Sequence, residues 1–233
     1  MTSAEPSTPL SKLPNFDPCT FPVLGVDQHL PAVDKTQLQP DALRRRFSSP
    51  PDWTPEVRTE PRFTQKQMAQ ASVLIPIIAH EQPTVLLTQR TSHLANHSGQ
   101  IAFPGGKVDD TDTDAIMTAL REAQEEVGLA ADFIQVLGTL PIYTTGSAFI
   151  ITPVVALVRP GFTLELNPGE VADVFEVPLD FLMNPAHHRR HTLTIEGLER
   201  HWFSMPYQDL QTERFIWGAT AGMLRNFYRF LIA

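Results

Sequence analysis

The chain of 233 residues is poor in cysteine: it contains only Cys19. One cysteine excludes an internal disulfide bond and any zinc site built from several cysteines. The chain also lacks an apolar run of about 18 residues, the length of a membrane-spanning helix. Its first residues, MTSAEPSTPLSKLPNFDP, show neither an apolar signal core nor an arginine-rich targeting pattern. We therefore expect a cytoplasmic protein without a membrane partner.

Positive charge is also scarce. The chain has 18 lysines and arginines against 26 aspartates and glutamates, which gives a formal net charge of −8. This balance argues against a nucleic-acid partner, because binding to a phosphate backbone needs a basic surface. Hydrophobic residues make up 42% of the chain. The length and this composition together allow one domain with a substantial core and an extension.

Proline is abundant but unevenly placed, since eleven of the 21 prolines precede residue 62. We predict that residues 1–40 form a proline-rich N-terminal arm that is partly disordered. Residues 41–233 are predicted to form the domain, with 41–69 as its lead-in. The stretch DALRRRF at 41–47 is expected to be a short helix whose three arginines lie on a solvated face.

A regular pattern of strands begins at residue 71. The first two predicted strands, ASVLIPIIA and TVLLTQR, form a hairpin, and QIAF is a third short strand that PGG stops. The other segments expected to be regular are strands at 133–145 and 148–158, a hairpin over 191–205 that turns at Glu196-Gly197, and a helix over 215–232. Strands mixed with a few helices indicate one α/β or α+β domain.

The segment between Gly105 and Leu129 predicts a further helix. Asp112 or Thr113 is expected to cap its start, and Gly128 is expected to end it in the left-handed conformation. Its apolar residues recur at helical spacing and are predicted to face the core; they are Ile116, Ala119, Leu120, Ala123 and Val127.

Three glutamates, Glu122, Glu125 and Glu126, share one face of this helix. Like charges at such spacings cost about 0.2–0.5 kcal/mol per pair, so a plain acidic surface is one explanation. A metal site is the other, because no basic residue follows at the spacing that relieves repulsion and a Gly-Gly loop precedes the helix. Converging oxygen ligands suit a hard cation such as Mg²⁺ or Mn²⁺. Spacing alone leaves both open.

The same segment resembles the Nudix box, G-x5-E-x7-R-E-U-x-E-E-x-G-U, where U is a bulky aliphatic residue. Gly106 opens the match, and REAQEEVGL at 121–129 closes it. Asp112 stands where the family has its first glutamate, one extra residue separates it from Arg121, and Ala123 replaces the bulky aliphatic residue. The resemblance implies the Nudix fold, a mixed β-sheet sandwiched between α-helices.

The resemblance also implies a hydrolase that cleaves a nucleoside diphosphate linked to another group. Bound cations neutralise the diphosphate and lower the pKa of a bound water. The implied metal ligands, for Mg²⁺ or Mn²⁺, are Glu122, Glu125, Glu126 and the carbonyl of Gly105. Glu125 and Arg121 belong to the implied catalytic set, with Arg121 holding a glutamate by a charge-assisted bond.

The stretch before the helix carries information about the substrate. LLTQRTSHLANHSGQIAFPGG at 86–106 resembles the signature of the coenzyme A pyrophosphatase branch, L-L-T-x-R-[SA]-x3-R-x3-G-x3-F-P-G-G. It departs from the signature at Thr91 and at Ala95, where the second arginine is missing. The resemblance implies that coenzyme A or acyl-CoA is cleaved to 3′,5′-ADP and (acyl-)4′-phosphopantetheine.

Three residues near this signature are candidates for substrate binding. Arg90, at a predicted strand end facing the Gly-Gly loop, is the best candidate for a phosphate contact. Lys107 is a second candidate, with a solvent-facing lysine as the alternative. His97 is a third, and its alternative is a local hydrogen-bonding role. Ala95 removes a fixed positive charge from the same stretch.

A further acid, Glu170, follows the predicted Pro168-Gly169 turn. It is expected to open a short helical or irregular stretch. Nudix enzymes often carry a metal ligand or general base on a loop after the box, so Glu170 joins the catalytic candidates. The alternative is a first-turn glutamate that the helix dipole favours. Asp173 and Glu176 are weaker candidates.

Two other functions remain open. The first is a Nudix pyrophosphatase for ADP-ribose or a dinucleotide; the lack of a four-cysteine zinc site counts against the NADH-cleaving relatives. The second is a non-catalytic Nudix binding domain, but such domains commonly lose box glutamates that this chain keeps. A small-molecule nucleotide of the coenzyme A class is the expected partner. The sequence leaves open whether the protein forms a homodimer.

Overall fold

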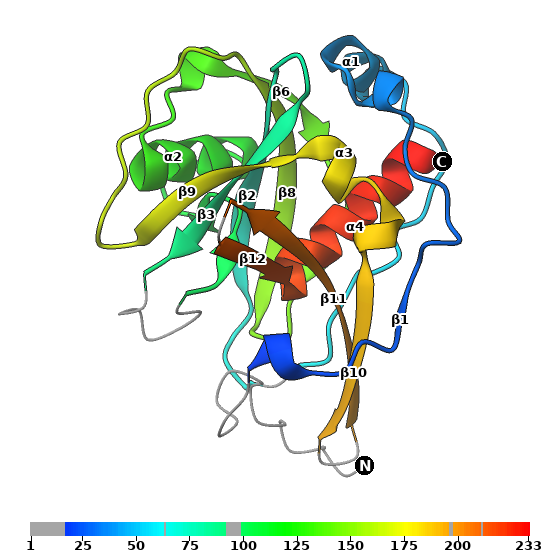
Figure 1. The fold of residues 1–233 in the computed structure, drawn as a ribbon. Coiled ribbons are helices and arrows are strands. Elements are labelled where there is room, and N and C mark those ends of the chain that lie inside the picture. Colours follow the sequence, from blue (N-terminus) through cyan, green and yellow to red (C-terminus); the bar gives the residue numbers. More distant parts are fainter. Residues whose placement is uncertain (1–16, 63, 92–98, 196–197, 211) are drawn as a thin grey trace.

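The computed structural model describes residues 17–62, 64–91, 99–195, 198–210 and 212–233. Within these residues the chain forms a larger and a smaller β-sheet together with helices, and Figure 1 shows their arrangement. No helix within it is long and apolar enough to cross a membrane.

The larger sheet forms the centre of the fold. Within the described residues it has eight strands, with the order β4-β3-β2-β8-β6, and β5, β7 and β9 pair with β2, β8 and β3. The bounds are β2 Ala69–Ile78, β3 Thr84–Arg90, β4 Ile101–Ala102, β5 Gly105–Lys107, β6 Ile134–Thr139, β7 Tyr143–Thr144, β8 Phe149–Val158 and β9 Val171–Pro178. Strands β2 and β8 are parallel, whereas the other pairs are antiparallel. The sheet is therefore mixed, as predicted.

The smaller sheet has the order β1-β10-β11-β12. Its strands are β1 Gly25–Val26, β10 Arg189–Ile195, β11 Leu198–Asp209 and β12 Thr212–Trp217. The predicted hairpin over 191–205 is confirmed by the antiparallel pairing of β10 with β11. Its predicted turn at residues 196–197 lies outside the described residues.

Helices cover both faces of the larger sheet (Figure 1). Helix α2, Ala115–Val127, packs its apolar stripe on one face, where Ala119, Ala123 and Val127 are fully buried against strand residues. Helix α4, Gly218–Ile232, and the smaller sheet enclose a second apolar cluster on the opposite face. The predicted core-facing stripe of α2 is thus confirmed, and the mixed sheet does lie between helices.

The remaining helical segments are short. Helix α1 spans Pro40–Ser48, so the predicted helix at 41–47 is confirmed, and α3 spans Leu179–Leu182. Single 3₁₀ turns lie at Pro18–Thr20, Lys35–Leu38, Ala131–Phe133 and Pro185–His187. In the N-terminal part, β1 pairs with β10. The division at residue 40 stays a prediction.

One predicted element boundary is wrong. The last helix begins at Gly218 and not near residue 215, because residues 212–217 pair with β11 as strand β12. The predicted end of the third strand before the PGG stretch is confirmed, since β4 ends at Ala102. The short strand β5 was not predicted; its Gly105 and Gly106 pair with Val73 and Ser72. In β12 and β5 a neighbouring strand satisfies backbone groups that the local sequence pattern does not reveal.

Candidate active site

The glycine pair places backbone directly against a carboxylate of α2. A Cβ atom on Gly106 would lie 2.4 Å from Glu122 Oε1, and one on Gly105 would lie 2.4 Å from the carbonyl oxygen of Ser72. Only glycine allows approaches this close. The glycine pair therefore lies directly against the acidic face of α2.

The caps of α2 set where its glutamates lie. Asp114 caps the start, and its Oδ1 accepts the N–H of Met117 at 2.8 Å. The predicted caps Asp112 and Thr113 are wrong, because Asp112 is drawn to an arginine instead. Gly128 ends the helix with φ 71°, in the left-handed conformation that was predicted.

Glu126 is the buried member of the acidic face. Its side chain is 3% exposed and accepts hydrogen bonds from the Gly105 N–H at 3.0 Å and from Arg90 Nη1 at 3.3 Å. Burial raises its pKa to about 7; Gly105 and Arg90 oppose this rise, and the carboxylates of Glu122 and Glu170 add to it. The hydrogen bonds and the arginine at Glu126 thus do not fully offset the cost of burying its negative charge.

Glu122 stands next to it, with its side chain 14% exposed and 3.1 Å from Arg121 Nη2. Burial raises its pKa, Arg121 lowers it, and the neighbouring Glu125 and Glu170 raise it again. Glu170 therefore acts electrostatically on both Glu122 and Glu126. These three carboxylates form the charged centre of the candidate site.

Arg121 binds more groups than the sequence suggested. Its guanidinium makes two bonds to Asp112, from Nε to Oδ1 and from Nη2 to Oδ2, both 3.0 Å. It also donates to Glu125 Oε2 at 2.9 Å and to the Lys107 carbonyl at 3.0 Å. The Arg121 guanidinium holds the pKa of the Asp112 carboxyl well below its usual range. The expectation that no basic residue relieves the repulsion on this face is wrong for Glu125.

Glu170 is the last residue of a turn and directly precedes β9. Its carbonyl accepts the Thr91 N–H at 3.0 Å, and its Oε1 accepts Asn167 Nδ2 at 3.3 Å. The predicted helical or irregular stretch is wrong, because the chain continues as a strand. The alternative role as a first-turn helix residue falls with it.

The weaker acidic candidates are bound elsewhere. Asp173 accepts Arg214 Nη2 at 2.6 Å, and Glu176 accepts hydrogen bonds from His80 at 3.0 Å and from Thr84. Neither carboxylate is among the charges that shift the pKa values of Glu122 and Glu126.

The other predicted residues are placed as follows. Glu125 has a side chain that is 57% exposed and lies beside Arg121, so it is the outermost of the three box glutamates. Lys107 Nζ lies 5.9 Å from the ring centroid of Phe149. Gly105 contributes its N–H to Glu126, and the role of its carbonyl stays a prediction. His97 and Ala95 lie outside the described residues.

Glu122 and Glu126 are the carboxylates best placed to hold a divalent cation. Among the described residues, no three His, Cys, Asp or Glu side chains converge as a ready-made metal cluster. The donor chemistry nevertheless fits, because Glu122 and Glu126 offer oxygen ligands whose pKa values are raised mainly by burial and further by neighbouring carboxylates. A bound cation would favour the ionised form of both groups.

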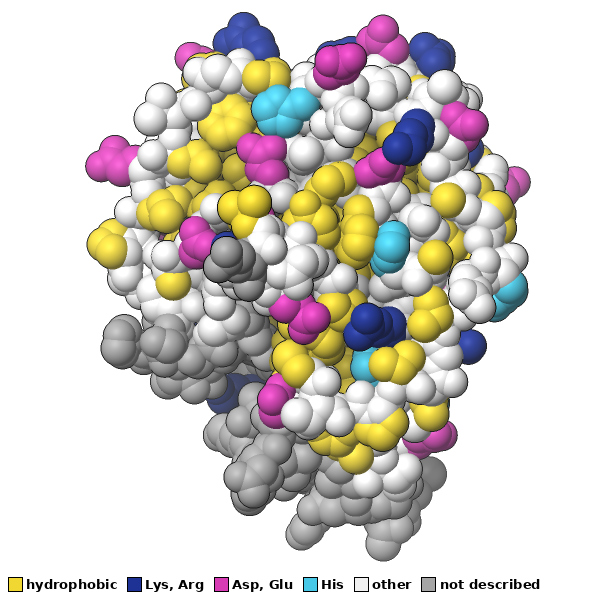
Figure 2. Space-filling view, viewed as in Figure 1, with side chains coloured by type: hydrophobic (Ala, Val, Ile, Leu, Met, Phe, Trp, Pro, Cys, Tyr) yellow, Lys and Arg dark blue, Asp and Glu magenta, His cyan; other side chains and the backbone are white. Residues whose placement is uncertain are grey.

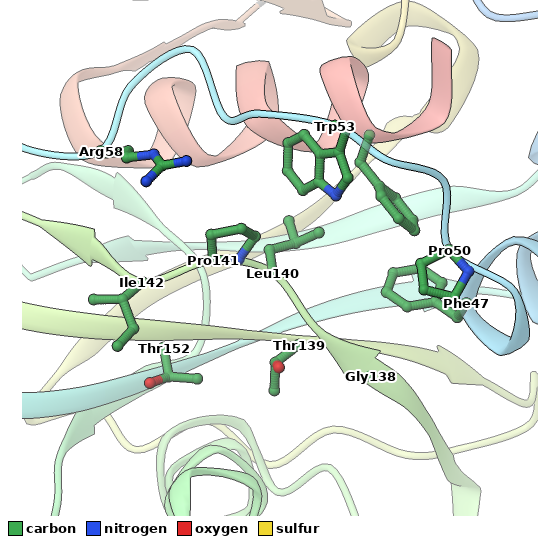
Figure 3. A pocket seen from close by; sticks show the side chains of 11 residues that line it. Phe47, Pro50, Trp53, Arg58, Gly138, Thr139, Leu140, Pro141, Ile142 and Thr152 are labelled. Atoms are coloured by element: carbon green, nitrogen blue, oxygen red, sulfur yellow. The ribbon is translucent and has the colours of Figure 1, made fainter. Parts of the chain in front are cut away.

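One cavity lies away from the acidic centre. Its volume is about 790 Å³, and it is lined by residues of α1, α4, the β6–β7 region, β8 and the 50–58 segment. In Figure 3 Trp53 lies over Leu140 and Pro141, with Arg58 toward one end. None of the box residues lines this cavity. On the face shown in Figure 2, lysine and arginine side chains do not gather into a basic patch.

The NUDIX domain family matches residues 68–197, which is more than half of the chain. The chain belongs to the Nudix family. Similar curated proteins include Nudix hydrolase NudL of Pectobacterium atrosepticum, 46% identical over 161 residues that cover 69% of this chain and 81% of the relative. NudL of Escherichia coli strain K12 is 44% identical over 160 residues, with coverage of 67% and 80%. The protein is thus a Nudix hydrolase.

Solved Nudix structures also resemble the chain, though distantly. A Caenorhabditis elegans Ap4A hydrolase complex is 20% identical with a TM-score of 0.41, and covers 51% of this chain and 86% of its own. The NUDIX domain of Shewanella oneidensis NrtR, complexed with ADP-ribose, is 24% identical with a TM-score of 0.39, and covers 49% and 75%. Nudix hydrolases act on nucleotide derivatives and generally use divalent cations.

Proposed function

We propose that this Nudix hydrolase cleaves the diphosphate of coenzyme A or acyl-CoA, yielding 3′,5′-ADP and (acyl-)4′-phosphopantetheine. The observation that carries the proposal is the surroundings of Glu126. A buried carboxylate is held between a backbone amide and Arg90, with Glu122 and Glu170 close enough to raise its pKa. Perturbed carboxylates of this kind gather at functional sites more often than elsewhere.

Each residue has a distinct task in the proposed reaction. Glu122 and Glu126 would hold Mg²⁺ or Mn²⁺, which supplies charge neutralisation of the diphosphate and a more acidic bound water. Arg90, at a strand end beside Glu126 and with a side chain 26% exposed, has room to bind a phosphate oxygen as well. Glu170 acts as general base or as a further ligand. Arg121 orients Glu122 and Glu125.

The coenzyme A assignment is supported by the 86–106 signature, of which Arg90 and the Gly-Gly pair are placed at the acidic centre. The residues between Thr91 and Gly99, which include Ala95 and His97, lie outside the described part, so the support from this signature comes from its other residues. ADP-ribose or a dinucleotide is the second candidate substrate. A binding function without catalysis is disfavoured by the retained Glu122, Glu126 and Glu170.

One assay tests the proposal. The purified protein is incubated with coenzyme A, ADP-ribose, NADH and diadenosine polyphosphates, each with Mg²⁺ and with Mn²⁺, and the products are identified by mass spectrometry. Coenzyme A should be cleaved fastest at equal concentration, to 3′,5′-ADP and 4′-phosphopantetheine. Rapid cleavage of another substrate without coenzyme A cleavage would refute the substrate assignment. No cleavage of any of them would refute the catalytic proposal.

A further inference from the structure

Arg214 binds on the far side of the sheet from the acidic centre. It lies on β12, beyond the residues that match the Nudix family. Its guanidinium contacts three acceptors on three different strands: Gln89 Oε1 at 2.8 Å, Asp173 Oδ2 at 2.6 Å and Asp209 Oδ2 at 3.3 Å. The side chain therefore joins β3 and β9 of the larger sheet to β11 of the smaller one.

Two of these acceptors stand at an irregularity in the larger sheet. Gln89 and Asp173 are register partners in the pairing of β3 with β9. The next pair is Arg90 with Val171, so the register shifts and Ala172 is the extra residue of a β-bulge. A bulge re-aims the side chain that follows it and is a point where pairing can yield. Arg214 holds the last regular pair before that point.

The bulge lies on β9, and on the partner strand β3 the residue paired just beyond it is Arg90. Neighbouring residues of a strand point to opposite faces, so Gln89 points toward Arg214 and Arg90 toward α2. There Arg90 Nη1 lies 3.3 Å from Glu126 Oε1, and the next residue, Thr91, donates its N–H to the Glu170 carbonyl. A shift of Gln89 would therefore move the residues that face the acidic centre.

Arg214 and its three acceptors, together called the clamp, are partly enclosed. The Arg214 side chain is 11% exposed, and its guanidinium carbon lies 4.3 Å from the ring centroid of Phe175. Its acidic partners are more open, with side chains that are 46% exposed for Asp173 and 30% for Asp209. The Arg214 bonds are charge-assisted, and one guanidinium makes all of them at once.

We propose that Arg214 is a positioning residue for Arg90: it holds Gln89 and Asp173 in register and thereby sets where the Arg90 guanidinium stands beside Glu126. The inference rests on the proposed function, because Arg90 is there assigned to bind a substrate phosphate. Arg214 itself touches no substrate. It acts through its hydrogen bond to Gln89, the residue that precedes Arg90 on β3.

A double-mutant cycle tests this role. The variants are Arg214→Gln, Arg90→Gln and the pair together, with Arg44→Gln as a matched control because Arg44 forms an exposed ion pair with Asp41 on α1. Arg214→Gln should lower kcat/KM for coenzyme A about 10-fold and share the KM-against-kcat pattern of Arg90→Gln, since a small misplacement of a binding group is costly. In the Arg90→Gln background its further effect should be less than twofold.

Gln89→Leu gives an independent variant, because it cuts the link but leaves both ion pairs of Arg214 intact. It should reproduce the loss seen with Arg214→Gln, which separates positioning from a general loss of fold. An unchanged kcat/KM in both variants, or a full multiplicative loss in the Arg90→Gln background, would overturn the inference.

A second readout does not depend on activity. The Thr91 amide, bonded to the Glu170 carbonyl, should exchange its hydrogen at least 10-fold faster in Arg214→Gln, while the amide of the buried Leu86 keeps its rate. An equal hydrogen-exchange rate of the Thr91 amide in wild type and variant would overturn the positioning role of Arg214, whatever the activity of the variant. If no substrate is cleaved, the proposed function fails and the exchange experiment still decides the clamp.

Discussion

Two groups of charged side chains in this molecule are both buried, yet they are balanced in opposite ways. Around Glu126, the carboxylates of Glu122 and Glu170 raise its pKa, while Arg90 contacts Glu126 at 3.3 Å and Arg121 contacts Glu122 at 3.1 Å. Around Arg225, one arginine that is 2% exposed is enclosed by Asp27 at 3.0 Å and Glu56 at 2.7 Å. The first group has more carboxylates than arginines, whereas the second has more arginines than carboxylates, since Arg190 also contacts Asp27 and Arg229 contacts Glu56.

The difference suggests different roles for the two groups, a structural one for the Arg225 cluster and a functional one for the surroundings of Glu126. The Arg225 cluster joins α4 to β1 and to the 50–58 segment, and the rings of Phe203 and Tyr228 stack near its guanidinium at 5.1 and 5.3 Å. A buried ion network with all partners present stabilises or specifies a fold but has no charge left for a ligand. On the proposed function, the excess of carboxylates around Glu126 would be offset by a bound metal ion.

The largest effect is expected from Glu126→Gln, which keeps the shape but removes a charged ligand. It should lower kcat by about 10³-fold or more, as expected when a metal ligand and its charge are lost. The melting temperature at pH 8 should be unchanged or higher: the folded pKa of Glu126 lies above its unfolded value, so its ionised form opposes folding. Steady-state kinetics and calorimetry measure both. Glu81→Gln, on an exposed turn, is the control, and near wild-type turnover of Glu126→Gln would remove Glu126 from the metal site.

The opposite pattern is expected for Arg225→Ala. Removal of the cation leaves Asp27 with Arg190 alone and the partly exposed Glu56 with only the more distant Arg229, which should cost about 1–3 kcal/mol of unfolding free energy. The kcat of the folded fraction should stay within twofold of wild type. Urea unfolding followed by fluorescence gives the stability, with Arg44→Ala as an exposed control that should cost under about 1 kcal/mol. A loss of kcat without a loss of stability would erase the contrast between the two groups.

Glu170→Gln probes the third carboxylate of the acidic centre. If Glu170 is the general base, kcat should fall about 10²-fold, with little change in unfolding free energy. The rate is measured across the pH range, because a base also shapes the acidic limb of the profile. A loss below threefold at every pH would assign Glu170 to the turn alone.

The last prediction concerns the pH dependence of the free energy of unfolding. His188 donates from Nε2 to the Leu182 carbonyl and accepts Arg225 Nη1–H at Nδ1, so the ring is neutral, and burial lowers its pKa to about 4. Asp27 opposes this shift, and Arg225 and His187 add to it. The unfolded chain therefore takes up the proton first.

Stability should consequently be level above pH 6.5 and should fall as the pH drops toward 4, by up to about 3 kcal/mol for a group of this burial. Urea unfolding at a series of pH values measures the slope. His188→Gln should flatten it in this window, although the variant is less stable at neutral pH. An equal slope in wild type and variant would show that other groups carry the acid response.

Local patterns predicted much of the scaffold. The β2–β3 hairpin, the buried stripe of α2 and its glycine cap depend on residues that are neighbours in the chain, and all three are confirmed. The family could also be identified from the spacing within residues 86–129, because a loop and one helix carry the motif. The assignments of the individual site residues remain predictions.

What the sequence by itself determined is therefore the α2 segment, its acidic face and the family to which they belong, since each depends on contacts within a few turns of chain. Only the tertiary structure decided that β12 is a strand, that Asp112 anchors Arg121, and that Arg214 reaches Gln89 and Asp173. These features depend on partners from distant elements. A side chain's local spacing cannot specify which distant group will satisfy its charge, because burial and strand pairing select that partner only when the layers pack.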